Sequence, residues 1–246
     1  MLIKAVLFDI GETLWHSLAA PSPEEFRRRS ADRVASVLQS LGIQRDDPGA
    51  VARCAWLAVE GAIREARAGD LREPDYVAIA RDALAADGLR LSADQVAVVL
   101  DAAYVSGVEG GKEAFADARP TLDELRRRGF LLATVTNRAF GGPRFRDDLR
   151  AAGLEIGWDA ESVSVEVGYL KPHPAVFRHA LEMLRVEAGE ALMVGNSLRE
   201  DVAGAQALGI MAAWVRSKPD AEGVTPDFVI ESVSGLLDLP PLRGRP

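Results

Sequence analysis

The sequence has a single cysteine and no long run of apolar residues. With Cys54 alone, no disulfide can form within the chain, and the lack of a secretory signature makes a reducing cytoplasm the expected location. No apolar run approaches the roughly 18 residues of a membrane-spanning helix. The apolar residues 1–10 are interrupted by Asp9 and are too few for a signal peptide, so they predict a buried strand.

The chain also lacks an excess of basic residues. Its 29 lysines and arginines face 37 aspartates and glutamates, which gives a formal net charge of −8. Nucleic acids and anionic membranes are bound through basic surfaces, so neither is an expected partner. The 246 residues are enough for a full core and for two domains. Nothing in the composition indicates an oligomeric state.

Short apolar runs alternate with helical stretches along most of the chain. The β-prone runs lie at residues 3–9, 130–136, 162–165, 192–194, 212–215 and 228–230. Helices are predicted at residues 120–128, 145–152, 174–184 and 199–208, with a short one at 234–237 and a frayed tail after Pro240. This alternation predicts an α/β fold, with a parallel sheet of βα units and helices on both faces.

The segment from residue 17 to residue 112 has a different character. Alanine, arginine and glutamate dominate it, and no strand-like run appears. Start and stop signals predict four helices, at residues 23–41, 47–68, 73–87 and 92–104. Gly107, Gly110 and Gly111 predict a hinge at its end. We therefore expect a helical domain over residues 17–112, inserted into a core domain made of residues 1–16 and 113–246.

Polar residues follow four of the predicted strands at the point where each ends. Asp9 follows the first, Thr136 ends the second, Lys171 lies beyond the third, and Asn196 and Asp201 follow the fourth. Ligands of open parallel sheets bind outside the carboxyl ends of the strands, so we expect these side chains to share one crevice. Carboxylates can hold a divalent cation, while a hydroxyl and a lysine can hold an anion. The set suits phosphoryl transfer with an aspartate nucleophile.

The segments around these residues resemble the motifs of the haloacid dehalogenase superfamily and follow in that family's order. They are FDIGETL at residues 8–14, TN at 136–137, GYLKPHP at 168–174 and GNSLREDVAGA at 195–205. Each motif alone is weakly specific, whereas all four in order are strongly specific. The resemblance covers the first strand and nearly everything after residue 118. It implies a Rossmann-like core, with the helical insert in the place of the family's helical cap domain.

The resemblance also implies a role for each matched residue in the hydrolysis of a small phosphorylated metabolite. Asp9 would be the nucleophile that attacks phosphorus and becomes an aspartyl-phosphate. Thr136 and the backbone N–H of Asn137 would hold the phosphoryl oxygens. Lys171 would neutralise charge between Asp9 and the phosphoryl group, because a carboxylate and a phosphate otherwise repel each other.

The metal that the resemblance implies is Mg²⁺, held by Asp9, the Gly11 carbonyl, Asn196 and Asp201. Two of these positions depart from the family's pattern. An acidic residue is replaced by Asn196, whose amide oxygen can still ligate Mg²⁺. At Gly11, the family's phosphatases carry a second aspartate that acts as general acid and base. Glycine keeps the carbonyl but removes this proton shuttle, which typically contributes roughly 10²–10⁴-fold to the rate.

Glu12 and His16 are the two candidates to replace the missing acid–base group. Glu12 lies one residue further along the chain. An adjacent position usually faces elsewhere, which favours a Glu12 that only solvates the turn. A lone histidine in a loop is more often a surface or hinge residue than a catalytic one.

Three other functions fit part of the pattern. A 2-haloacid dehalogenase also lacks the second aspartate and attacks carbon without a metal, but it has no use for a metal ligand at Asp201. Phosphonatase chemistry needs a lysine in the cap, and residues 5–111 contain none. The third alternative is a catalytically impaired protein that keeps the phosphate site for binding or regulation, and Gly11 is its support.

Overall fold

The structure is a computed structural model of the chain that describes residues 2–17, 20–105, 109–216 and 223–243. The chain divides into two compact units. Met1–Leu18 together with Lys112–Pro246 form the first, called the core unit below, and Ala19–Gly111 form the second, called the helical unit. No helix among the described residues is both long and apolar enough to cross a membrane.

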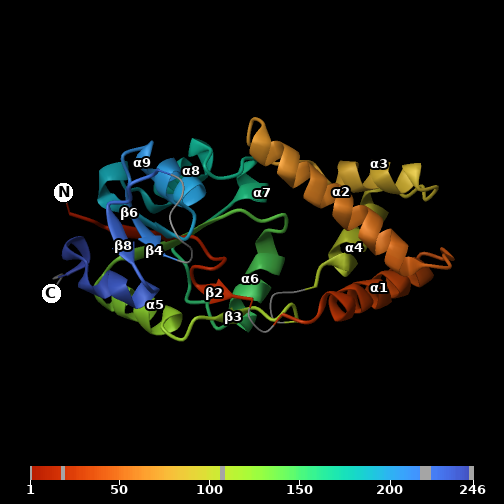
Figure 1. Cartoon of the computed structure of the whole chain (residues 1–246), viewed down its shortest axis with the longest axis horizontal. Coiled ribbons are helices and arrows are strands. Elements are labelled where there is room, and N and C mark those ends of the chain that lie inside the picture. Colours follow the sequence, from red (N-terminus) through yellow and green to blue (C-terminus); the bar gives the residue numbers. More distant parts are fainter. Residues whose placement is uncertain (1, 18–19, 106–108, 217–222, 244–246) are drawn as a thin grey trace. The chain divides into compact units, whose positions relative to one another are not determined.

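A six-stranded parallel sheet forms the centre of the core unit, in the order β5-β4-β1-β6-β7-β8 (Figure 1). Its strands are β1 (Ala5–Phe8), β4 (Leu131–Thr136), β5 (Ala160–Val163), β6 (Ala191–Gly195), β7 (Met211–Val215) and β8 (Phe228–Ile230). Ala5 of β1 is in register with Leu131 of β4 on one side and with Ala191 of β6 on the other. The first strand therefore lies inside the sheet, between two strands that follow the helical unit in the sequence.

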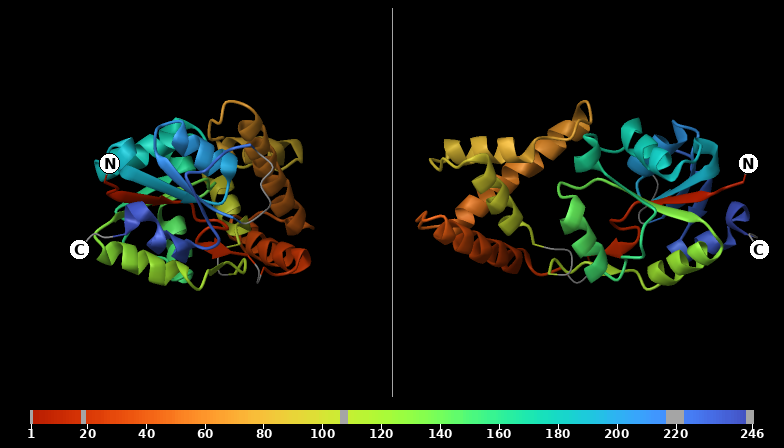
Figure 2. Two further views of the ribbon diagram at one scale, coloured as in Figure 1. Left: turned by 60° about the vertical axis from the view of Figure 1, so that its left-hand side comes forward. Right: turned by 180° about the vertical axis from the view of Figure 1, so that it is seen from behind.

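Helices cover both faces of this sheet (Figure 2), because side chains alternate between the faces along each strand. Val6 and Phe8 of β1 pack in one apolar cluster with α5 (Ala118–Arg127) and α6 (Gly142–Ala151). Ala5 and Leu7 pack in a second cluster with α8 (Pro174–Leu184). The shorter segments are α7 (Ser164–Val167), η1 (Ala188–Glu190), η2 (Leu198–Ala203), α9 (Gly204–Gln206), η3 (Val233–Asp238) and η4 (Pro240–Leu242). These layers confirm the predicted α/β fold class.

The strand predicted at residues 162–165 is misplaced by two residues. β5 ends at Val163, and Ser164 begins α7. The Ser164 hydroxyl accepts a hydrogen bond from the Arg138 backbone N–H (2.9 Å) and lies 3.3 Å from the Arg138 carbonyl oxygen. Local bonding between a serine side chain and the backbone competes with strand pairing, which is why the strand stops here.

The C-terminal tail is packed against the core rather than frayed from Pro240 onward. Leu242, the last residue of η4, is fully buried. The guanidinium of Arg128 donates to the carbonyls of Leu237 (2.9 Å) and Leu242 (3.2 Å). The prediction of a frayed tail is therefore wrong up to residue 243, and residues 244–246 lie outside the described part of the chain.

A small two-stranded antiparallel sheet, called the hairpin below although its strands are far apart in the sequence, was not predicted. β2 (Trp15–His16) pairs with β3 (Glu113–Ala114), and the Phe115 N–H continues the pairing to the Leu14 carbonyl (3.0 Å). The two strands flank the whole helical unit in the sequence. The hairpin therefore closes the core unit at the point where the helical unit is inserted.

Over its described residues, 20–105 and 109–111, the helical unit has four helices: α1 (Pro23–Ser40), α2 (Pro48–Ala68), α3 (Tyr76–Ala86) and α4 (Ala93–Ala103). Each begins after a side chain that accepts a hydrogen bond from a backbone N–H of the first turn, and these four caps are Ser22, Asp47, Asp75 and Ser92. The cap at Asp75 explains why α3 starts three residues after the predicted position. Residues 107 and 108 of the predicted hinge lie outside the described residues.

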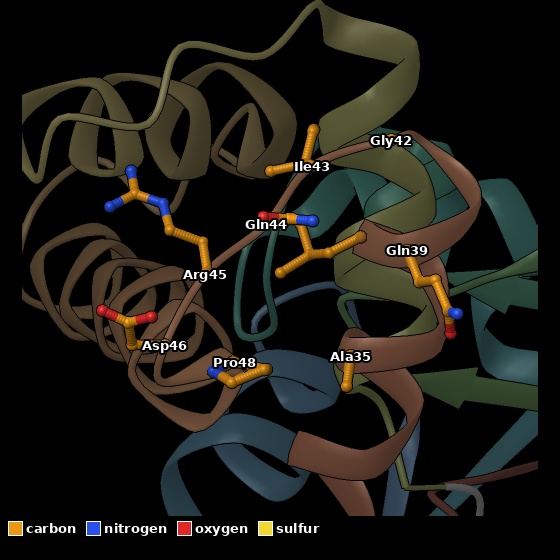
Figure 3. Close-up of a pocket in the computed structure, with 9 residues that line it drawn as sticks. Ala35, Gln39, Gly42, Ile43, Gln44, Arg45, Asp46 and Pro48 are labelled. Atoms are coloured by element: carbon orange, nitrogen blue, oxygen red, sulfur yellow. The ribbon is translucent and has the colours of Figure 1, made fainter.

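The connection between α1 and α2 borders a hollow of about 480 Å³ (Figure 3). Residues Gln39 and Pro48 line it from the two helix ends, and Ile43 lines it from the loop. Figure 3 shows the side chains of Arg45 and Asp46 extending from this loop. None of the predicted site residues lines the hollow.

A buried ion pair ties the loop after β4 to α6. The guanidinium of Arg138 pairs with the carboxylate of Asp148, whose side chain is only 1% exposed. The same guanidinium lies over the rings of Trp15 and Phe145, with its central carbon 5.3 and 5.0 Å from their centroids. Arg138 therefore joins the hairpin, α6 and the end of the strand that carries Thr136.

We expect Asp148→Ala to lower the free energy of unfolding by about 3–5 kcal/mol, because a buried guanidinium loses its carboxylate partner. The matched control is the neighbouring Asp147→Ala, which removes an exposed carboxylate paired with Arg150 and should cost less than about 1 kcal/mol. Urea unfolding of both variants measures the difference. Equal losses would show that the Arg138 pair contributes no more than a surface pair.

Candidate active site

Three charged side chains meet at the carboxyl edge of the sheet. Asp9 directly follows β1, and its backbone N–H donates to the Val194 carbonyl of β6 (2.9 Å). The ammonium of Lys171 donates to Oδ1 of Asp9 at 2.6 Å and to Oδ1 of Asp201 at 2.7 Å. The side chains of Lys171 and Asp201 are each only 1% exposed. Asp9, Lys171 and Asp201 are called the carboxylate–lysine cluster below.

Burial and charge act in opposite directions on this cluster. Burial by itself would lower the pKa of Lys171, but the carboxylates of Asp201 and Asp9 raise that pKa above its ordinary value. Burial raises the pKa of Asp201, although Lys171 and the backbone N–H of Ser197, 2.9 Å from its Oδ2, act against the rise. Two anions share one cation, so the ionised cluster has an excess negative charge that a further cation would offset.

Thr13 belongs to the site, although the sequence analysis gave it no role. Its hydroxyl lies 3.3 Å from Oδ2 of Asp9 and 3.5 Å from Oδ1 of Asn196, and it can donate to one of them at a time. The carbonyl of Ile10 accepts from the N–H groups of Thr13 (3.3 Å) and Leu14 (2.9 Å). This turn brings residue 13 back to Asp9, so a spacing of four residues within FDIGETL was the signal for it.

Thr136 and Asn137 lie at the end of β4, the strand beside β1. Thr136 is the last residue of β4 and is 4% exposed. The Asn137 side chain holds the Lys171 loop: its Oδ1 accepts from the Lys171 N–H (2.7 Å), and its Nδ2 donates to the Lys171 carbonyl (3.3 Å) and to Oε2 of Glu200 (3.2 Å). Only the backbone of Asn137 had been given a role. The direction of its side chain and the contact with Glu200 could not be predicted from the motif.

Gly11 and Glu12 lie in the turn between β1 and β2. A Cβ at Gly11 would meet no heavy atom within 4 Å, so this position has room for a side chain. Glu12 adopts a left-handed backbone with φ of 54°, and its side chain is exposed. It lines a cavity of about 240 Å³ together with Phe115 and Val215. No member of the carboxylate–lysine cluster lines this cavity.

His16, the other candidate for proton transfer, is part of the hairpin. It lies in β2, where its backbone is in register with Glu113 of β3. Its ring contacts the ring of Phe115 edge to face, with centroids 4.8 Å apart. This packing gives His16 a structural role in holding the hairpin together.

Oxygen atoms at this edge of the sheet suit a hard divalent cation. The donors that Lys171 and Thr13 bring together are the carboxylates of Asp9 and Asp201 and the amide of Asn196. No described contact connects the Gly11 carbonyl, the fourth predicted donor, with them. Mg²⁺ is commonly held by one or two carboxylates, while waters and substrate phosphates complete its octahedron. Within the ranges that the structure describes, no group of three or more His, Cys, Asp or Glu side chains could hold a metal. The two-carboxylate set therefore fits Mg²⁺ by donor type.

Comparison with known proteins gives a family match. A family model described as haloacid dehalogenase-like hydrolase matches residues 3–209. A phosphoserine phosphatase from Thermus thermophilus is 39% identical over 117 residues, which cover 46% of each chain. A glyceraldehyde 3-phosphate phosphatase from Methanopyrus kandleri is 26% identical over 247 residues, which cover 97% of each chain. The chain thus spans about half the length of the first relative and nearly all of the second.

The likeness extends to solved structures. The crystal structure of a 2-haloacid dehalogenase from Pseudomonas syringae is 26% identical in sequence, with a TM-score of 0.67, and the match covers 96% of this chain and 97% of the other. These matches confirm the family that the four motifs predicted. Because proteins named as phosphatases and as a dehalogenase are both similar, the chemistry has to be argued from the site.

The left-handed backbone at Glu12 generates a test of the turn that follows Asp9. An L-residue in this conformation is strained by roughly 1–2 kcal/mol, whereas glycine is not, although glycine loses more entropy on folding. We expect Glu12→Gly to raise the free energy of unfolding by up to about 1 kcal/mol. Glu12→Ala keeps Cβ and should give no gain in urea unfolding. A similar gain in both variants would assign the effect to the lost charge.

Proposed function

Because this chain belongs to the haloacid dehalogenase-like hydrolases, we propose that it is a Mg²⁺-dependent phosphatase of a small phosphorylated metabolite. The observation that carries the proposal is the buried Asp201 beside Asp9, with Lys171 between them at 2.6 and 2.7 Å. A second buried carboxylate next to the nucleophile would repel an anionic substrate. It becomes useful when a divalent cation binds, because the net charge of the site then changes from negative to positive.

The reaction begins with an attack of the Asp9 carboxylate on phosphorus. The P–O bond to the leaving group breaks as the bond to Asp9 forms, which gives an aspartyl-phosphate. Lys171 orients Oδ1 of Asp9, while Thr13 lies against Oδ2. Thr136 and the backbone N–H of Asn137 hold the phosphoryl oxygens. Water then attacks phosphorus, which releases inorganic phosphate and regenerates Asp9. Asp9, Asp201 and Asn196 would hold Mg²⁺, which would neutralise the charge of the phosphoryl group.

We also propose that the helical unit is the cap of this enzyme and that its closure excludes water from the crevice. The chain leaves the core unit after β2, which follows the Asp9 segment, and returns to it just before β3. A movement of the helical unit would act on the core through this hairpin. Specificity for the leaving group would then come from the helical unit, whose sequence matches none of the family's motifs.

A 2-haloacid dehalogenase is the second candidate function. Gly11 favours it, because an enzyme of that kind needs no acid–base group at this position. The similarity to the Pseudomonas syringae dehalogenase also favours it. Asp9 would then attack carbon and release a halide without a metal. In this alternative Asp201 would only hold the Lys171 ammonium, and the excess negative charge of the carboxylate–lysine cluster would not be offset.

We expect the purified protein to hydrolyse p-nitrophenyl phosphate slowly in the presence of Mg²⁺ and to stop when EDTA is added. Asp9→Asn should abolish the activity, because an amide cannot form the aspartyl-phosphate. Asp147→Asn, a change at an exposed carboxylate on α6, is the control and should leave the rate unchanged. An active Asp9→Asn enzyme would contradict the nucleophile assignment. Metal-independent release of halide from a 2-haloacid would favour the dehalogenase.

Gly11 generates a second test, because the proposed mechanism has no acid–base group at this position. The hydrolysis rate of phosphate esters with poor alkoxide leaving groups should be reduced more than that of aryl or acyl phosphates. The aspartyl-phosphate should accumulate. We expect Gly11→Asp to raise the turnover of alkyl phosphates, by roughly 10²–10⁴-fold at best. The open space around a Cβ at Gly11 makes the variant feasible. Steady-state rates on alkyl and aryl esters and acid trapping of the phosphoenzyme measure the effect.

Glu12→Gln is the paired control for this experiment. We expect little change, because the Glu12 side chain is exposed and lines the cavity beside Phe115. If Glu12→Gln stops an otherwise fast enzyme and Gly11→Asp has no effect, Glu12 is the proton shuttle. If neither change matters and no phosphoenzyme can be trapped, the protein is a phosphate-binding protein on a hydrolase fold.

A further inference from the structure

We propose that Glu200 is a positioning residue of this site, which sets Lys171 in place through the side chain of Asn137. The inference rests on the proposed function for its effect on rate, but its geometry is independent of the reaction. Glu200 lies in η2, next to Asp201, and its Oε2 accepts from Nδ2 of Asn137 at 3.2 Å. It was not among the residues that the motifs single out.

The side chain of Asn137 holds the backbone of Lys171. The amide accepts from the backbone N–H of Lys171 (2.7 Å) and donates to its carbonyl (3.3 Å). Both backbone polar groups of Lys171 are therefore held next to the end of β4. From there the Lys171 side chain runs into a fully enclosed place between two carboxylates. Because the side chain is only 1% exposed and its ammonium contacts both carboxylates, a shift of the backbone would move the ammonium relative to Asp9.

The contact with Glu200 fixes the orientation of the Asn137 amide. Oε2 of Glu200 accepts the hydrogen bond from Asn137, whereas an amide has one accepting and one donating end. Glu200 therefore keeps Nδ2 on the side of the Lys171 carbonyl and leaves Oδ1 for the Lys171 N–H. A flipped amide would turn its oxygen toward both the carboxylate and the carbonyl, and its NH₂ toward the N–H. Glu200 thus selects the orientation that grips Lys171.

The backbone of Glu200 is itself anchored. Its backbone N–H donates to the Ser197 hydroxyl at 3.0 Å, and the next residue, Asp201, bonds directly to the Lys171 ammonium. One short segment therefore holds Lys171 at both ends. It holds the backbone through Glu200 and Asn137, and the ammonium through Asp201. The segment after β6, the end of β4 and the Lys171 loop are fixed as a single unit.

The rate test uses Mg²⁺ and p-nitrophenyl phosphate. We expect Glu200→Ala to lower kcat on the order of tenfold, as for the loss of one hydrogen bond to a charged group. Glu200→Gln should stay within about threefold of the parent, because its amide oxygen can still accept from Asn137. The pH profile of kcat should keep its shape in both variants. If Gln is as harmful as Ala and one limb of the profile disappears, Glu200 transfers protons and the positioning role is wrong.

A double-mutant cycle tests whether Glu200 acts through Asn137. We expect Asn137→Ala to lower kcat at least as much as Glu200→Ala, and the double variant to be no slower than Asn137→Ala alone. Multiplying losses would overturn the proposal, because Glu200 would then act by a separate route. Glu161→Ala is the matched control. This half-buried glutamate of β5 pairs with Arg146 (3.0 Å) and not with a member of the carboxylate–lysine cluster. Its loss should leave kcat within about twofold of the parent.

A readout without turnover separates this inference from the proposed function. The side-chain NH₂ signals of Asn137, identified by their loss in Asn137→Ala, should shift in the NMR spectrum of Glu200→Ala and stay in place in Glu161→Ala. If the parent hydrolyses no phosphate ester but the signals shift, the proposed function fails and the positioning contact stands. If the signals do not respond to Glu200→Ala, the positioning role is overturned whatever the activity.

Discussion

One buried ammonium holds the candidate active site together. Lys171 is shared by Asp9 and Asp201, two carboxylates that would repel each other strongly in a place so far removed from water. The carboxylates come from the ends of β1 and from the segment after β6, which are neighbours in the sheet. The order of the strands therefore brings two carboxylates close together. The loop after β5 supplies Lys171, whose ammonium offsets the repulsion between them.

The same constraint explains why so much of the local structure serves Lys171. A long, flexible side chain can be enclosed only if its backbone is fixed, and the amide of Asn137 fixes both the N–H and the carbonyl of that residue. Farther out, Arg138 is held by Asp148 and by the rings of Trp15 and Phe145. Packing on α6 and in the hairpin thus stabilises the strand end from which Asn137 reaches the lysine.

The sequence predicted the sheet and its strand-end residues because these depend on local patterns: apolar runs, helix caps and motif spacing. It missed the β2–β3 hairpin, since two-residue strands carry no periodicity and pair across about a hundred intervening residues. The end of β5 was misplaced because the Ser164 hydroxyl bonds to a loop far away in sequence. The directions of Asn137 and Glu200 were out of reach for the same reason. They depend on how three loops meet, and no single loop encodes that.

The turn after Asp9 is held by backbone hydrogen bonds that do not need a side chain at residue 11. The Ile10 carbonyl still accepts from Thr13 and Leu14, so the turn keeps its shape although residue 11 has no side chain. No neighbour has moved into the space that a Cβ would occupy. Glu12 takes the left-handed conformation that the turn demands and is exposed as a result. The contacts of Asp9 therefore do not need a side chain at position 11, so under the proposed function Gly11 affects proton transfer rather than structure.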